Sequence, residues 1–150
     1  MTGNSNAVCV DASVVVKWLL PEIDSAIAKA LLRDCAKSDT ELRAPTHLQF
    51  EAGSAVYKRL RAGDLTAQEA DLALETLWQF ELTLVPARSL ASRALSIADQ
   101  LKQKLPYDSF CLALGEIADC EVWTADARFH KAAASLYPRL KLLSGYQSLS

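Results

Sequence analysis

Short apolar runs alternate with longer amphipathic segments along the whole chain, a pattern that predicts a parallel β-sheet covered by helices. The apolar runs predict strands near residues 7–10, 41–44, 82–85, 121–124 and 140–143. The longer segments predict helices over 25–37, 45–61, 66–80, 88–104 and 107–118. We therefore expect the α/β class, with a mostly parallel central sheet of four or five strands.

Local signals mark where several of these helices begin and end. Pro45 in a first turn and Gly63 after a last turn bound the second predicted helix. Thr66 and Glu69 have the spacing of a capping box, which predicts the start of the next helix. The helix over 88–104 is predicted to finish in a basic last turn that suits its dipole.

Length and composition favour one domain over 1–150, with a core over about 7–143. A domain of this size buries roughly 70% of the surface that its unfolded chain exposes. Apolar residues make up 51% of the chain, slightly above the usual share, so some of them are expected to form an interface. Trp18, Leu19 and Leu20 cluster before a proline and are the candidates for self-association.

The net charge of −2 and the pI of about 5.7 exclude a global basic field that would attract nucleic acid. A nuclease is still compatible with this charge, because a carboxylate-rich site lowers the total. The four cysteines are scattered, without a Cys-x-x-Cys pair, which favours reduced thiols. The chain starts with a short polar segment and contains no run of about 20 apolar residues, so we expect a soluble, cytoplasmic protein without a membrane partner.

Acidic residues stand where predicted strands end. Asp11 closes the first apolar run, Asp126 follows the fourth, and Asp108 lies at the start of a predicted helix. The carboxyl ends of parallel strands face the crevice where such folds bind their ligands. Carboxylates that converge there repel one another unless a cation lies between them, and oxygen ligands suit Mg²⁺ or Mn²⁺.

Glu51 is a fourth candidate because it lies on or beside the apolar stripe of its predicted helix, three residues after Leu48 and four before Ala55. A buried carboxylate needs a partner, since an unpaired one would become protonated. That partner is either a metal ion or an arginine such as Arg43.

Helix capping is the alternative role for Asp11, Asp108 and Asp126, because aspartate is among the best N-cap residues. Ser13 is an alternative cap for the first helix. Capping and metal binding are both compatible with the sequence at these positions.

Other polar residues carry weaker signals. Glu116 and Asp119 are expected on a solvated helix face, and His47 and His130 are expected to be ordinary surface or helix residues. A nucleophilic Gly-x-Ser-x-Gly elbow and a glycine-rich phosphate loop are both missing from the sequence. The basic residues that could follow an RNA backbone include Lys17, Lys58, Arg128 and Lys131.

Four short segments, each holding one of the four acids, resemble in order and spacing those of the PIN-domain nucleases. These are 8–13, 50–52, 106–110 and 124–129, and the resemblance extends from about residue 8 to about residue 143. Within that family, the sequence is most similar to the VapC-type toxins of toxin–antitoxin pairs.

The resemblance implies a three-layer α/β/α fold and a divalent-metal-dependent endoribonuclease that hydrolyses RNA phosphodiesters. It implies that Asp11, Glu51, Asp108 and Asp126 are catalytic and hold Mg²⁺ or Mn²⁺. It also implies that hydroxyl groups such as those of Ser13 and Thr124 hydrogen-bond the carboxylates or bound water. The implied partners are an RNA substrate, a small antitoxin and a second copy of the chain.

One position departs from the family pattern, since many relatives carry a further acid where this chain has Ala127 and Arg128. Binding of a second ion is therefore in question. Two other functions stay open: a catalytically inactive PIN-like scaffold that binds a partner, and a phosphoacceptor receiver domain. The receiver fits poorly, because no acidic pair surrounds Asp11 and Lys141 falls inside the last predicted strand.

Overall fold

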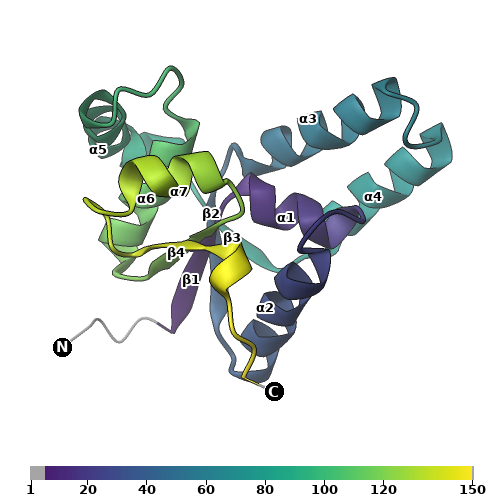
Figure 1. Cartoon of the computed structure of the whole chain (residues 1–150), viewed down its shortest axis with the longest axis horizontal. Coiled ribbons are helices and arrows are strands. Elements are labelled where there is room, and N and C mark those ends of the chain that lie inside the picture. Colours follow the sequence, from purple (N-terminus) through teal and green to yellow (C-terminus); the bar gives the residue numbers. More distant parts are fainter. Residues whose placement is uncertain (1–5, 150) are drawn as a thin grey trace.

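The central element of the structure is a parallel sheet of five strands in the order β3-β2-β1-β4-β5 (Figure 1). The structure is a computed structural model and describes residues 6–149. Every neighbouring pair of strands is parallel, as the alternating pattern predicts. The strands are β1 (Ala7–Val10), β2 (Glu41–Pro45), β3 (Leu82–Val85), β4 (Glu121–Thr124) and β5 (Leu140–Leu142).

Helices follow the strands and cover both faces of the sheet, which confirms the predicted three-layer α/β/α architecture. None of the helices within residues 6–149 is long and apolar enough to cross a membrane. The helices are α1 (Ala12–Leu19), α2 (Ser25–Lys37), α3 (Leu48–Arg61), α4 (Ala67–Gln79), α5 (Ala87–Gln100), α6 (Tyr107–Ala118) and α7 (Ala127–Ala133), and a short 3-10 turn, η1 (Leu143–Gly145), follows β5.

The predicted start of α3 is wrong. Pro45 does not lie in the first helical turn but is the last residue of β2, where it pairs with Val85. A proline is tolerated at this position because the next residue takes over the hydrogen bonding: the Thr46 N–H donates to the Val85 carbonyl at 3.1 Å. The helix therefore begins three residues later, at Leu48.

The predicted end of α5 is also wrong, because the helix stops at Gln100 and has no basic last turn. Lys102 has a φ of 55°, in the left-handed region. The Gln103 N–H donates to the Ala98 carbonyl at 3.0 Å and the Lys102 N–H to the Asp99 carbonyl at 3.2 Å, the pattern of a Schellman C-cap. By contrast, the capping box of α4 is confirmed.

Two hydrophobic cores lie on opposite faces of the sheet. Side chains alternate along each strand, so Val10 and Trp123 face the core under α1 to α4, while Cys9 and Val122 face the core under α5 to α7. The first core also buries Trp18 and Leu20. Trp18 and Leu20 therefore do not form part of a surface for self-association, and the prediction is wrong for these two residues.

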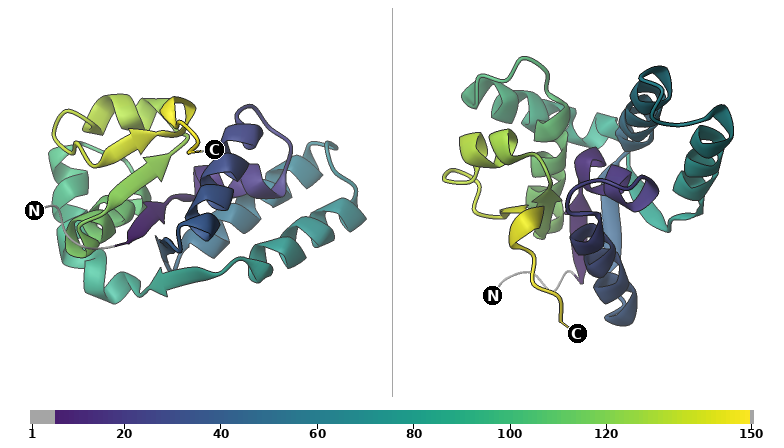
Figure 2. Two further views of the ribbon diagram at one scale, coloured as in Figure 1. Left: turned by 90° about the horizontal axis from the view of Figure 1, so that it is seen from below. Right: turned by 45° about the vertical axis from the view of Figure 1, so that its right-hand side comes forward.

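Helices α3 and α4 run side by side as a hairpin that extends away from the sheet (Figures 1 and 2). The connection turns at Gly63, whose φ of 83° is readily adopted by glycine and rarely by other residues. Leu72 and Trp78 are exposed on α4. This hairpin gives the molecule a projecting arm beside the carboxyl ends of β1 and β2.

The chain order of the strands reverses between β1 and β4, which are neighbours in the sheet with Val10 opposite Trp123. Ligand sites in open α/β sheets lie beyond the carboxyl ends of strands at such a switch point. Helix α6 packs closely on β4 because it carries Gly115, where a Cβ would overlap the side chain of Val122. The fold thus brings α6 against the two strands that end in acidic residues.

Candidate active site

Asp11 lies at the switch point, directly after β1, and is the N-cap of α1. Its side chain is buried, and Oδ1 accepts hydrogen bonds from the backbone N–H groups of Ser13 at 3.0 Å and Val14 at 3.3 Å. The local sequence explains this arrangement, because an aspartate between a strand and a helix satisfies amides that the first turn leaves free. Capping and a role in a site are therefore not exclusive at this residue.

The hydroxyl groups of Ser13 and Thr124 connect the ends of β1 and β4. Ser13 Oγ donates a short hydrogen bond to Asp11 and accepts the Ala125 N–H at 2.8 Å. Thr124 Oγ1 lies 3.4 Å from Ser13 Oγ and accepts the Asp126 N–H at 3.1 Å. Ser13 is therefore not the cap of α1, and both hydroxyls bridge the segments that carry two of the acids.

Asp126 is the N-cap of α7. Its Oδ1 accepts the N–H groups of Arg128 at 2.9 Å and Phe129 at 3.1 Å. Unlike Asp11, the residue is exposed. The second carboxylate oxygen is therefore turned toward solvent while the first is engaged by the helix.

Glu51 and Asp108 occupy the first turns of α3 and α6, and neither is an N-cap. Glu51 Oε1 lies 3.2 Å from His47 Nε2, one helical turn away. Arg43, the sequence-based alternative partner of Glu51, instead pairs with Glu41 at 2.8 Å. The structure shows no hydrogen bond to Asp108 from any residue in 6–149.

All four carboxylates line one cleft of about 330 Å³, although they come from four different segments of the chain. Ala12, Ser13, Leu105 and Tyr107 complete its walls. The cleft therefore has acidic groups converging from the strand ends on one side and from two helix N-termini on the other.

The electrostatics of the cleft raise two carboxyl pKa values. Burial raises the pKa of Asp108 to about 7, with further increases from the negative charges of Asp11, Glu51 and Asp126. Burial also raises the pKa of Asp11 to about 6, although hydrogen bonds from Ser13, Thr124 and Val14 act in the opposite direction. Desolvation is the largest cause in both cases and repulsion between the acids is secondary.

The donor set fits a hard divalent cation, since it consists of carboxylate oxygens in a partly dry cleft that makes their negative charge costly. Among residues 6–149, no three acidic, histidine or cysteine side chains are already grouped as a metal cage. Magnesium sites in proteins often use only one or two carboxylates and keep several water molecules. The cleft therefore suits a hydrated ion better than one held entirely by protein ligands.

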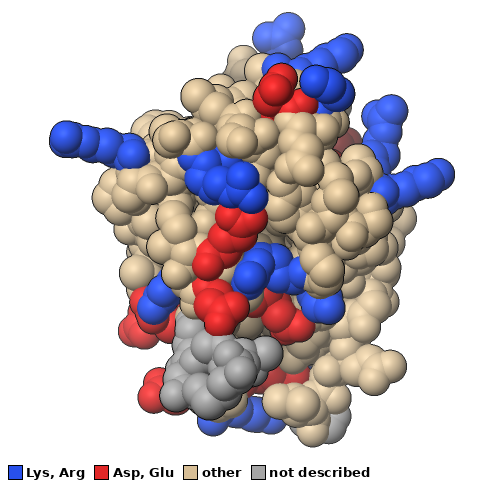
Figure 3. Space-filling model, turned by 90° about the vertical axis from the view of Figure 1, so that its left-hand side faces the viewer, with Lys and Arg blue, Asp and Glu red and all other residues tan. Residues whose placement is uncertain are grey.

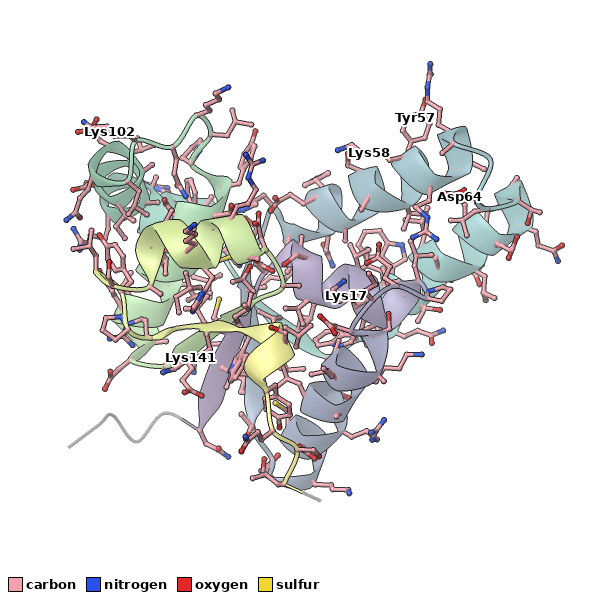
Figure 4. The ribbon with its side chains drawn as sticks, viewed as in Figure 1. Lys17, Tyr57, Lys58, Asp64, Lys102 and Lys141 are labelled. Carbon is pink, nitrogen blue, oxygen red and sulfur yellow. The ribbon has the colours of Figure 1, made fainter. Side chains whose placement is uncertain are left out.

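The predicted RNA-binding residues Lys17, Arg128 and Lys131 do not line this cleft. Lys17 pairs with Glu22 at 3.5 Å and is largely covered (Figure 4). Arg128 and Lys131 are exposed on α7, next to the Asp126 cap. On the face shown in Figure 3, acidic and basic side chains are interspersed, so that face has no single-sign field.

Glu116 and Asp119 do not join the site, because they lie at the opposite end of α6 from Asp108. Glu116 accepts two hydrogen bonds from Arg93, at 2.7 and 2.9 Å, and Asp119 lies 3.6 Å from Arg139. Both are thus engaged in ion pairs rather than simply solvated.

Sequence reasoning missed His47, which was expected to be an ordinary helix residue. Its ring packs against Tyr107 and Phe110, with centroids 5.4 and 5.3 Å away, and Nε2 is buried beside Glu51 without a hydrogen bond from the described residues. The available signal was the spacing of four between His47 and Glu51, which places both on one helix face. Only the packing of α6 against α3 shows that this face borders the cleft.

Comparisons with known proteins agree with this architecture. Residues 8–135 match the family model described as PIN domain. The chain is 34% identical over 138 residues to Ribonuclease VapC3 of Mycobacterium tuberculosis, in each of two strains, a match that covers 91% of this chain and 94% of the relative. The crystal structure of PAE2754 from Pyrobaculum aerophilum superposes with a TM-score of 0.64 at 18% identity, over 97% of this chain and 94% of that one.

Proposed function

The chain belongs to the PIN domain family and is of the VapC type, and we propose that it is a divalent-metal-dependent endoribonuclease that hydrolyses RNA phosphodiesters. The observation that carries the proposal is the convergence of Asp11, Glu51, Asp108 and Asp126 on one cleft at the topological switch point. The similarity to a protein named a ribonuclease supports RNA as the substrate.

The four carboxylates would hold Mg²⁺ or Mn²⁺, and the raised pKa values of Asp11 and Asp108 support this assignment. A cation at this position would supply Lewis-acid activation of water and neutralise charge at the phosphodiester. Asp108 gains most from such a cation, because in its absence the carboxylate accepts no hydrogen bond within the described residues and, of the neighbouring charges, only that of His47 favours its ionisation. Asp126 is the sole acid of its segment, with Ala127 and Arg128 following, so we propose one firmly held ion.

The side chains around the acids would orient them. Ser13 and Thr124 hold the ends of β1 and β4 together, and so fix the separation of Asp11 and Asp126. His47, the residue before α3, packs against Tyr107 and Phe110 of α6 and lies beside Glu51. The protein contributes positioning and a desolvated environment, and needs no side-chain nucleophile.

We also propose that the chain is the toxin of a toxin–antitoxin pair, with a small antitoxin protein as partner and a homodimer as its assembly. The VapC-type relative supports this assignment. The phosphoacceptor alternative has lost its basis, because residues 8–135 match the PIN family model. A scaffold without catalytic activity is the alternative that the experiment below distinguishes.

The test is cleavage of a labelled RNA by the purified chain with and without Mg²⁺ or Mn²⁺. We expect cleavage that EDTA stops and that added metal restores. Asp108→Asn should abolish it while leaving the circular dichroism spectrum unchanged. Cleavage that continues undiminished in EDTA would contradict the metal proposal, and the absence of cleavage with either metal would favour the scaffold.

A further inference from the structure

A second hollow, of about 590 Å³, runs along α3 beside the acidic cleft. The two hollows adjoin, since Glu51, Leu105 and Tyr107 line both. We call the second hollow the α3 groove; its walls include Phe50, Glu51, Ser54, Lys58, Leu105 and Tyr107. The α3 residues among these recur every three or four positions, so one outward face of the helix forms one wall.

The α3 groove contains two aromatic rings that the hydrophobic core does not bury. The core-facing stripe of α3 consists of Leu48, Ala52 and Val56, whereas Phe50 is 81% exposed and Tyr107 is 46% exposed. The Tyr107 ring packs against His47, which limits its orientation. Two aromatic residues therefore stand in the walls beside the acidic cleft with much of their surface free.

A cation completes the far end of the groove. Lys58 is exposed and makes no ion pair with a residue in 6–149, and it projects from the upper side of α3 next to Tyr57 (Figure 4). It lies seven residues after Glu51, roughly 10 Å along the helix axis. That length corresponds to about three bases at the ~3.4 Å spacing of a stacked strand.

We propose that the α3 groove binds a single-stranded segment of the RNA substrate beside the cleaved phosphate, with bases stacked on Phe50 and Tyr107 and a backbone phosphate on Lys58. The inference rests on the proposed function, because it takes the acidic cleft as the place of cleavage. Aromatic faces joined to a basic residue are typical of surfaces that bind single strands. Bases held in a duplex could not reach these rings, since their faces are already stacked.

Charge favours RNA bases over other apolar occupants near Glu51. A base is neutral, so it can lie beside the carboxylates without repulsion while its phosphate stays toward the cation-binding cleft and Lys58. An apolar protein segment would leave both the free Lys58 ammonium and the adjoining acidic cleft without a matching group. Because the groove and the cleft adjoin, RNA can make a contact at each end.

The experiment measures RNA binding in an Asp108→Asn background, where cleavage should not interfere. The probe is a fluorescent, unstructured RNA of roughly 10 nucleotides, within the site sizes of single-strand binders, compared with the same RNA annealed to its complement. We expect the single strand to bind more tightly than the duplex. Phe50→Ala should weaken single-strand binding about 5- to 150-fold, as loss of one stacked base implies.

Matched variants separate stacking from apolar contact and from loss of fold. Phe50→Trp should retain the affinity and Phe50→Leu should not, because leucine has no aromatic face. Trp78→Ala, which removes an exposed aromatic residue of α4 outside the groove, should bind as the background does. Phe50 is exposed, so its variants should melt at the temperature of the background protein.

The outcomes distinguish failure of this inference from failure of the proposed function. If the native chain cleaves RNA, and Phe50→Ala binds and cleaves RNA as well as the native chain does, the groove inference is overturned and the proposed nuclease activity is supported. If single-strand binding depends on Phe50 but no RNA is cleaved with either metal, the groove stands and the nuclease does not. A lower mass of Phe50→Ala by light scattering, with RNA binding unchanged, would overturn the inference by assigning the groove to self-association.

Discussion

The two sides of the acidic cleft hold their carboxylates in different ways. On the strand side, Asp11 and Asp126 each cap a helix and accept two backbone N–H groups. On the helix side, Glu51 and Asp108 lie within first turns and cap nothing. The helix dipole favours both of the latter, yet the pKa of Asp108 still rises to about 7, so the dipole does not offset burial.

This difference separates the acids that stabilise a helix from those that do not. The strand-side acids complete the first turns of α1 and α7, so a substitution there changes local structure as well as charge. Asp108 accepts no hydrogen bond in the described part of the chain, and burial and the neighbouring acids raise its pKa more than His47 lowers it, so its charge destabilises the metal-free protein. Residues whose charge lowers stability, and which cap no helix, are the stronger candidates for function.

The largest expected effect is on cleavage, and it should be similar on both sides of the cleft. We predict that Asp11→Asn and Asp108→Asn each lower kcat/KM for RNA by more than about 100-fold, since even residues that merely support metal ligands cost 10- to 100-fold. Asn keeps the shape of the side chain, and at position 11 it also keeps a capping group. Initial rates with a labelled RNA test this. Trp78→Ala, prepared in the same way, is the control and should cleave at the native rate. Residual activity above a tenth of the native rate in Asp108→Asn would remove that residue from the catalytic set.

The second prediction concerns pH and the stability of the metal-free protein. The pKa of Asp108 is 3.8 when unperturbed and about 7 in the folded chain, so between these values the native state binds more protons than the unfolded state. The free energy of unfolding should therefore fall as pH rises through this window. A pKa rise of about 3 corresponds to at most roughly 4 kcal/mol.

Denaturant unfolding in EDTA at about pH 5 and about pH 7.5 measures this change. In Asp108→Asn the fall should be smaller and the stability near pH 7.5 higher than in the native chain. Asp11, whose pKa is about 6, accounts for the dependence that persists. An equal slope in both proteins would show that the carboxyl of Asp108 is not desolvated in solution.

Much of this architecture could be predicted from the sequence because the signals are local. Strand positions follow from apolar runs, and Asp11 and Asp126 follow from the rule that strand ends meet at one edge of a parallel sheet. The two errors in helix bounds have local causes too. Proline is common in the first turn of a helix, which predicts Pro45 there, but Pro45 ends β2. The left-handed conformation of Lys102 ends α5 before the predicted basic turn. The groove along α3 and the position of His47 depend on contacts between α6 and the start of α3. The spacing of residues within one segment does not predict such contacts.

The third prediction concerns the hydroxyl that joins the two strand ends. Ser13→Ala removes the acceptor of the Ala125 N–H and a donor to Asp11. We expect a loss of roughly 1–3 kcal/mol in unfolding free energy, because an amide is left without its partner. Ser13→Thr retains the hydroxyl and serves as the matched control. The thermal melt should show the loss in alanine only, together with weaker metal stabilisation, and an unchanged melt in Ser13→Ala would mean that water replaces the hydroxyl.

The smallest expected effect separates capping from charge at Asp126. Serine is about as good an N-cap as aspartate, whereas alanine is not, so Asp126→Ser should change the free energy of unfolding by less than about 0.5 kcal/mol and Asp126→Ala should lower it by about 1 kcal/mol. Both variants remove the carboxylate, so both should reduce the rise in melting temperature that Mg²⁺ or Mn²⁺ produces. A ligand at about 100 times its dissociation constant contributes roughly 2.7 kcal/mol, and that contribution should shrink equally in the two variants. If the metal response instead follows the cap, weakening in alanine but not in serine, then Asp126 acts on the site only by ordering α7, and the metal is held by the three remaining acids.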